Sequence, residues 1–245
     1  RMFTVERVVG TAPQSECKGR WVVCAPDAVG GFSATAYFFG KNLHKRLNVP
    51  VGLINSSWGG TPVEAWISAE ALQAMPSSKV ITDPWAARTA APWDEAKEMA
   101  AYDKQVAAWR ERVKQAKAAG KEPPRAPKKP VAPRLDPHHP ANLYNGMIAP
   151  LIPYAVRGAV WYQGESNARS DSSHLYGTQL ETLIADWRGR WGYAFPFAWV
   201  QLPNFKSSDR DWPLVREGML KTLKVPDTGM AVAMGLGESN NIHPK

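Results

Sequence analysis

Cysteine is scarce in this chain, with only Cys17 and Cys24 among 245 residues. The pair could form one disulfide in an exported protein or remain two free thiols, and neither has a histidine at metal-ligand spacing. Long apolar runs are also missing. No stretch of 18 apolar residues occurs, so the sequence predicts no membrane-spanning helix. The length suits one large α/β domain with a sizeable core.

Acidic residues are outnumbered, with 22 Asp and Glu against 30 Lys and Arg, which gives a net charge of +8. The excess is concentrated in one segment, because ten Lys or Arg and only two Glu lie between Lys104 and Arg134. The remainder of the chain is close to neutral. This distribution differs from the basic surface of a nucleic-acid-binding protein, so we expect no nucleic-acid partner.

The basic segment belongs to a predicted insertion at about 76–140. Residues 95–117 predict a long, solvated helix, and the prolines of 121–140 predict an extended tract. A solvated spacer explains this composition, and contact with an anionic surface is the alternative. His138 and His139 have no third ligand nearby, so we expect no metal site and no cofactor.

The rest of the chain alternates apolar, β-prone runs with amphipathic segments. This alternation predicts an α/β domain with a mainly parallel sheet. We expect strands at 2–9, 51–55, 156–162, 195–202 and 229–234, helices at 34–47, 175–191 and 215–223, short helical pieces at 62–67 and 69–75, and a loop at 142–150. Because the sequence opens inside a strand and stops abruptly, we expect the single domain 1–245 to be incomplete at both ends.

Polar residues follow three of the predicted strands, at 56–60, 163–167 and 238–243. Parallel sheets of this kind place their chemistry at the carboxyl ends of strands, so we expect the three loops to converge. Gly59 and Gly60 permit a tight turn and close approach of the backbone to a ligand. Ester hydrolysis needs a nucleophile, a base, a group that orients the base, and oxyanion donors.

These loops supply several of those groups. His243 is a candidate general base, Glu165 a carboxylate, and Gln163 and the Gly60 N–H candidate oxyanion donors. The residues alone leave the nucleophile open.

The chain resembles the sialate O-acetylesterase family of the SGNH-hydrolase superfamily, to which acetyl-xylan esterases are related. The specific motifs are Ser57-Trp58-Gly59-Gly60 and Trp161-Tyr162-Gln163-Gly164-Glu165-Ser166. Weaker matches lie at 3–7, 19–21, 32–34, 48–66, 142–150, 186–188, 195–197 and 242–244.

The resemblance implies a three-layer α/β/α, flavodoxin-like domain that deacetylates O-acetylated sugars and is exported. It implies a serine nucleophile in a Gly-Gln-Ser-Asn segment, which this sequence lacks, so we expect that serine upstream of Arg1. Gly60 and Gln163 would then stabilise the oxyanion, with His243 as the base. Trp58, Gly59, Ser166 and Asn167 are the expected substrate-binding residues.

One position departs from the superfamily pattern. Many members have Asp three residues before the catalytic histidine, and Asn240 stands there. Glu165, Glu238 or a backbone carbonyl would then orient His243.

Two other interpretations remain open. Ser57 lies between a predicted strand and a helical piece, so it could be the nucleophile of an α/β-hydrolase elbow, although Asn55 would crowd that turn. As a turn residue, Ser57 would instead bond within its own loop. The non-enzymatic alternative is a carbohydrate-binding module in which Trp58, Trp66, Trp161 and Tyr162 stack on sugars, although core packing accounts for most tryptophans.

Overall fold

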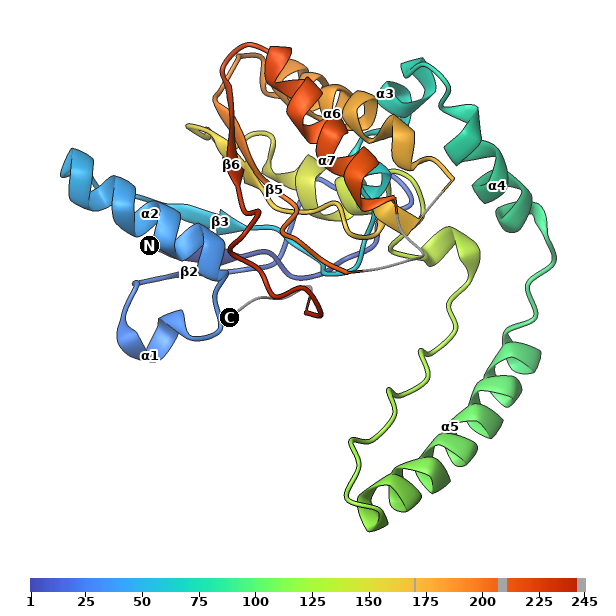
Figure 1. Cartoon of the computed structure of the whole chain (residues 1–245). Helices are drawn as coiled ribbons and strands as arrows, with labels where there is room; N and C mark the ends of the chain where they lie inside the picture. Colours follow the sequence, from blue (N-terminus) through green and yellow to red (C-terminus); the bar gives the residue numbers. More distant parts are fainter. Residues whose placement is uncertain (170, 207–210, 242–245) are drawn as a thin grey trace.

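The computed structural model describes residues 1–169, 171–206 and 211–241, and Figure 1 shows their arrangement. The strands are β1 (Met2–Thr4), β2 (Trp21–Val22), β3 (Leu53–Asn55), β4 (Ala159–Trp161), β5 (Phe197–Gln201) and β6 (Thr228–Val232). The α-helices are α1 (Pro26–Val29), α2 (Ala34–Leu47), α3 (Ala69–Ala74), α4 (Lys79–Ala90), α5 (Glu95–Ala118), α6 (Tyr176–Trp191) and α7 (Trp212–Lys221). Short helical turns include η1 (Val63–Trp66), η3 (Tyr144–Ile148) and η4 (Ala149–Leu151).

The strands form two three-stranded sheets, ordered β2-β1-β3 and β4-β5-β6. β1 pairs in parallel with β3, with Phe3 opposite Ile54, and antiparallel with β2. β5 pairs in parallel with both β4 and β6, with Trp199 opposite Trp161 and Met230. The strands therefore pair mainly in parallel, as the alternation of segments predicted.

The helices begin and end where their sequences indicate. The Ser33 side chain accepts a hydrogen bond from the Ala36 N–H at the start of α2, and Asn48 closes that helix at φ +51°. Gly192 ends α6 in the left-handed region at φ +77°, where a side chain would be strained. α6 and α7 pack against each other at Gly177 and Gly218, beside the β4-β5-β6 sheet (Figure 1).

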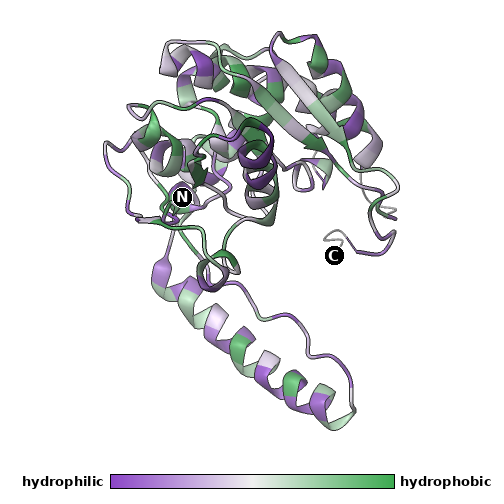
Figure 2. Cartoon of the chain, turned by 90° about the vertical axis from the view of Figure 1, so that its left-hand side faces the viewer, coloured by the Kyte–Doolittle hydropathy of each residue, from purple (hydrophilic) through white to green (hydrophobic). Residues whose placement is uncertain are grey.

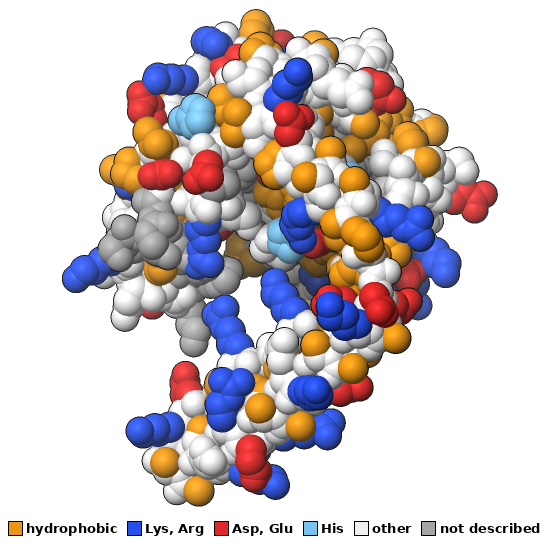
Figure 3. Space-filling view, turned by 90° about the vertical axis from the view of Figure 1, so that its right-hand side faces the viewer, with side chains coloured by type: hydrophobic (Ala, Val, Ile, Leu, Met, Phe, Trp, Pro, Cys, Tyr) orange, Lys and Arg blue, Asp and Glu red, His pale blue; other side chains and the backbone are white. Residues whose placement is uncertain are grey.

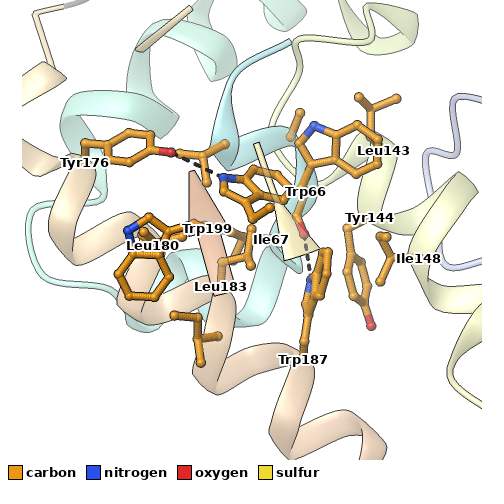
Figure 4. Close-up of a cluster of buried hydrophobic side chains, with 14 of the residues drawn as sticks. Trp66, Ile67, Leu143, Tyr144, Ile148, Tyr176, Leu180, Leu183, Trp187 and Trp199 are labelled. Atoms are coloured by element: carbon orange, nitrogen blue, oxygen red, sulfur yellow. Dashed lines mark hydrogen bonds between the residues drawn. The ribbon is translucent and has the colours of Figure 1, made fainter. Parts of the chain in front are cut away.

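A cluster of tryptophans fixes η1 against α6 (Figure 4). The rings of Trp66 and Trp187 each meet Trp161 edge to face, with centroids 6.1 Å apart. The Trp187 indole N–H donates to the Trp66 carbonyl at 3.0 Å. Asp186 of α6 accepts hydrogen bonds at 2.8 Å from both the N–H and the hydroxyl of Ser68. The segment that follows Gly60 is consequently buried and rigidly placed.

The predicted insertion forms an arm that projects from the body of the domain (Figures 1 and 2). α5 has no buried residue, and the proline-rich segment that follows it runs back alongside the helix. The Trp109 indole N–H donates a hydrogen bond to the Pro124 carbonyl at 2.8 Å and joins the two. Figure 3 shows Lys and Arg side chains gathered along this arm. The helix and the extended tract occur where the sequence predicted them.

Three local expectations were incomplete or wrong. Residues 142–150, expected as a loop, form the buried turn η3 and the start of the half-buried turn η4, because Tyr144, Met147 and Ile148 turn inward together. β2 and α4 were not predicted: β2 is only two residues long, and α4 contains Pro84, which normally signals a helix boundary.

Candidate active site

Two of the three polar loops expected at strand ends meet at Gly60. The Ser166 hydroxyl donates to the Gly60 carbonyl at 2.8 Å, and the Gln163 side-chain amide donates to the next carbonyl, Thr61, at 3.1 Å. β3 ends at Asn55 and β4 ends at Trp161, so each loop leaves its own strand before the contact. Residues 106 positions apart are thereby joined in one site.

Gly60 has the backbone of a tight turn at the surface of the protein. Its φ of +81° lies in the left-handed region, and a Cβ added there would meet no atom within 4 Å. The residue is exposed, and within 1–169, 171–206 and 211–241 no group accepts a hydrogen bond from its N–H. An available backbone donor in a fixed loop is the arrangement that oxyanion binding requires.

Gln163 and Asn167 connect this loop to the interior. The Gln163 amide nitrogen also donates to Asn167 Oδ1 at 2.7 Å, so its two hydrogens are both engaged within the protein. Asn167 Oδ1 accepts from the Val63 N–H at 3.0 Å, and its amide donates to Glu64 Oε2 at 2.9 Å. Asn167 is only 1% exposed, so it lies behind the site and positions its neighbours.

Glu64 is a buried carboxyl group at the inner end of this network. Its Oε2 accepts from the Asn167 amide and, at 3.1 Å, from the Gln179 amide. Burial raises the pKa of Glu64, while its hydrogen bonds and the charge of His138 act in the opposite direction. Gln179 Oε1 is buried without a hydrogen-bond partner among the described residues, so a protonated Glu64 would add a donor among these polar atoms.

Tyr176 is buried and holds the end of β4 in place through its hydroxyl group. Its hydroxyl donates to the Gln163 carbonyl at 2.8 Å and accepts from the Trp161 indole N–H at 3.3 Å. Burial raises the pKa of Tyr176 far above its ordinary value, so the hydroxyl stays a donor at every physiological pH. Burial raises the pKa of Tyr162, and the negative charge of the half-buried Glu165 raises it further.

A histidine and an aspartate complete the surroundings of Gly60. His138 Nε2 lies 2.9 Å from the Gly60 carbonyl oxygen, and His138 Nδ1 lies 2.8 Å from Asp136 Oδ1. The hydrogen bond to Asp136 raises the pKa of His138, an effect that partial burial opposes. From the sequence, His138 was weighed only as a metal ligand, and no metal site was expected there. The aspartate two residues earlier was the available signal for a hydrogen-bonded pair.

The third polar loop is only partly described. Glu238 accepts a hydrogen bond from the Asn241 side chain at 3.2 Å, and the Lys206 N–H donates to the Ser239 carbonyl at 2.6 Å. Glu238 therefore lies in a loop bonded to residues 204–206. His243, the candidate base, lies outside the described residues.

The remaining candidates differ in how exposed they are. The Ser57 hydroxyl donates to Asn55 Oδ1 at 2.8 Å, which is the bonding of a turn residue within its own loop. Trp58 is half-buried against the core, with the Arg7 guanidinium 5.8 Å from its ring centroid. Gly59 is exposed. Trp66 and Trp161 are buried in the tryptophan cluster, which removes them as sugar-stacking surfaces.

Cys17 and Cys24 are free thiols, so the disulfide left open by the sequence is not formed. In the described parts of the chain, no helix is long and apolar enough to span a membrane. Within the same residues, no three His, Cys, Asp or Glu side chains group so as to hold a metal ion.

Comparison with known proteins supports the resemblance seen in the motifs. Residues 136–245 match the model of a family described as carbohydrate esterase, sialic acid-specific acetylesterase. The sialate O-acetylesterases of Pongo abelii and Homo sapiens are each 32% identical over 234 residues, covering 87% of this chain and 36% of each relative. The chain thus spans about a third of the length of these curated relatives.

A solved structure agrees with the sequence comparison. The crystal structure of a carbohydrate acetylesterase from Xanthomonas citri is 31% identical and superposes with a TM-score of 0.72, covering 99% of this chain and 44% of that chain. This match confirms the α/β fold class expected from the resemblance.

Proposed function

We propose that the protein is a carbohydrate O-acetylesterase, because residues 136–245 match the model of the carbohydrate esterase family of sialic acid-specific acetylesterases. Its substrates would be O-acetylated sugars, sialic acid among them. The observation that carries the proposal is the junction of the loops 56–60 and 163–167. They meet at the exposed residue Gly60, whose N–H has no acceptor among the described residues. The two specific motifs of the resemblance are the two loops that form this junction.

In the proposed mechanism, the Gly60 N–H donates to the oxyanion that forms when a serine attacks the acetyl carbonyl. His243 takes the serine proton, the sugar hydroxyl departs, and water then releases acetate from the acetyl-serine. The resemblance places that serine in a Gly-Gln-Ser-Asn segment that residues 1–245 do not contain. Glu165 or Glu238 would orient His243.

Gln163 has a different part in this proposal from the one expected. Since both of its amide hydrogens are engaged by Thr61 and Asn167, Gln163 supports the oxyanion donor by fixing the loop that carries it. A direct bond from Gln163 to the oxyanion requires one of these contacts to open first. Among the expected substrate-binding residues, Gly59 is exposed and Trp58 and Ser166 are half-buried, so these three have surface that a sugar could contact, whereas Asn167 is buried.

The Ser57 alternative has less support. An elbow nucleophile needs a histidine that accepts its proton, and the Ser57 proton is directed to Asn55. The residues after Gly60 also form the 3-10 turn η1, where an elbow would continue into an α-helix. The binding-module alternative loses two of its four aromatic residues to the core.

The test measures acetate release by the protein encoded by the intact gene. We expect turnover of O-acetylated sialic acid, and a loss of at least 10³-fold in kcat for His243→Ala in a folded protein. Glu165→Gln should cost roughly 10–10³-fold, by analogy with triad carboxylates. Full activity in His243→Ala would refute the mechanism. Complete loss in Ser57→Ala would favour the elbow instead.

Localisation stays a prediction. A cleaved leader peptide on the product of the intact gene would support export, and a cytosolic protein without one would contradict it.

A further inference from the structure

His138 lies between two hydrogen-bond acceptors. Its Nδ1 is 2.8 Å from Asp136 Oδ1, and its Nε2 is 2.9 Å from the Gly60 carbonyl oxygen. A carbonyl oxygen only accepts, and an ionised carboxylate also only accepts. A neutral imidazole has one N–H and can satisfy one of these partners, whereas the imidazolium satisfies both at once.

The charged groups around the ring favour this imidazolium. Asp136 accepts a second hydrogen bond from the His138 backbone N–H at 2.8 Å, and Arg88 lies 3.8 Å from its other oxygen. These contacts hold the pKa of Asp136 low against the opposing effect of burial, so the carboxylate remains ionised. Glu64 also lies within electrostatic range of His138, but burial favours its neutral form, and Lys128 opposes the positive charge of the ring.

The other contact of the ring lies within the proposed oxyanion loop. The Gly60 carbonyl receives two donors, His138 from the end of the arm and Ser166 from the loop after β4. The next carbonyl, Thr61, is held by Gln163. Three side chains thus fix the turn at Gly60, and of these only His138 changes its number of donors near neutral pH.

We propose that His138 is a positioning residue that ties the turn carrying the Gly60 N–H to Asp136, donating to both at once only while its ring is protonated. We call the two hydrogen bonds of the His138 ring, to Asp136 and to the Gly60 carbonyl, the clamp. The clamp is inferred from geometry, and its effect on catalysis rests on the proposed esterase function. The pKa of His138 is raised above the ordinary 6.5, so the clamp is complete below pH 6.5. It is released as pH rises through the folded pKa, and kcat should fall over that interval.

A first experiment follows the ring itself. The protein is labelled with ¹³C at histidine Cε1, and the His138 resonance is assigned by its absence in His138→Gln. We expect a titration midpoint above 6.5 that moves down in Asp136→Asn. A midpoint at or below 6.5, or one unaffected by Asp136→Asn, would overturn the clamp whether or not the protein is an esterase.

A second experiment follows kcat and KM for an acetyl ester between pH 5.5 and 9.5. The wild-type kcat should fall on the basic side. His138→Gln keeps an N–H donor that does not titrate, so this basic fall should disappear. His138→Ala should lower kcat by about tenfold across the range, with KM changed less than threefold.

The matched control is the neighbouring residue. The His139 ring packs edge to face on Trp85, with centroids 5.2 Å apart, and its Nδ1 lies 2.9 Å from the Pro140 carbonyl. His139→Gln should leave the basic fall of kcat unchanged. If an active enzyme keeps the same basic fall in His138→Gln, the inference fails while the esterase function stands. If the protein lacks esterase activity, the proposed function fails and the titration still decides the clamp.

Discussion

Glu64→Gln should make the protein more stable at neutral pH, in a way that depends on pH. Glu64 is only 7% exposed, and burial raises its pKa above the ordinary 4.5. At low pH the carboxyl is neutral in both the folded and the unfolded state. As pH rises past 4.5, the unfolded chain loses this proton while the folded chain keeps it, so the wild type loses stability.

The magnitude follows from this linkage. Glutamine has nearly the shape of protonated glutamate, and its amide oxygen can accept from Asn167 and Gln179 as Oε2 does. Above pH 4.5, the free energy of unfolding of Glu64→Gln should exceed that of the wild type by about 1.4 kcal/mol more for each pH unit. The difference should stop growing at the folded pKa of Glu64.

The assay is urea unfolding of both proteins at half-unit steps from pH 4 to 8, because the difference between them removes the contribution of every other titrating group. Glu70→Gln is the control. The pKa of Glu70 is lowered by its backbone hydrogen bond and by Arg190, so its contribution to stability is already complete above pH 4.5, and the difference between Glu70→Gln and wild type should stay flat from pH 5 to 8. A Glu64→Gln difference that is flat or falls with pH would refute a protonated, buried Glu64.

Two glycine substitutions test the backbone, one in the turn of the site and one where α6 packs against α7. The added Cβ of Gly60→Ala would meet no neighbouring atom, but alanine would be forced to φ +81°. The variant should therefore lose about 1–2 kcal/mol of stability, and its kcat should fall because the turn is displaced. A wild-type kcat would show that the turn does not position the oxyanion donor. Gly218→Ala would place a Cβ 2.7 Å from the Gly177 nitrogen, so it should lower the free energy of unfolding by about 1–3 kcal/mol in a urea titration; an unchanged value would contradict the close α6–α7 packing.

The sequence predicted much of this fold because its signals are local. The apolar runs at 51–55 and 195–202 contain β3 and β5, and the capping serine at 33 correctly marked the start of α2. Short pairings such as β2 and the buried turn η3 have no such signal, because their stability comes from residues distant in the chain.

The site was predictable in the same measure. The loops 56–60 and 163–167 were identified because each follows a predicted strand, and the structure brings them together. The spacing of Asp136 and His138 could have suggested their hydrogen bond, but the contact of His138 with Gly60 and the burial of Glu64 could not be read from the sequence. They depend on where the arm rejoins the domain and on which carboxyl group becomes buried, and both are properties of the tertiary packing.

The most direct test of the central claim, that the junction of the two loops is the esterase site, is the kcat of Gln163→Ala. This substitution removes the donor to Thr61 and Asn167 and leaves other catalytic candidates in place. Gln14→Ala is the matched control, since Gln14 is exposed and its side-chain amide donates to the Ala12 carbonyl at 2.7 Å, within its own loop. We expect acetate release from an O-acetylated sugar to fall in Gln163→Ala, with the roughly 10²–10³-fold cost of losing an oxyanion donor as the upper limit, and to stay at the wild-type rate in Gln14→Ala. A folded Gln163→Ala protein that retains wild-type kcat would contradict the account.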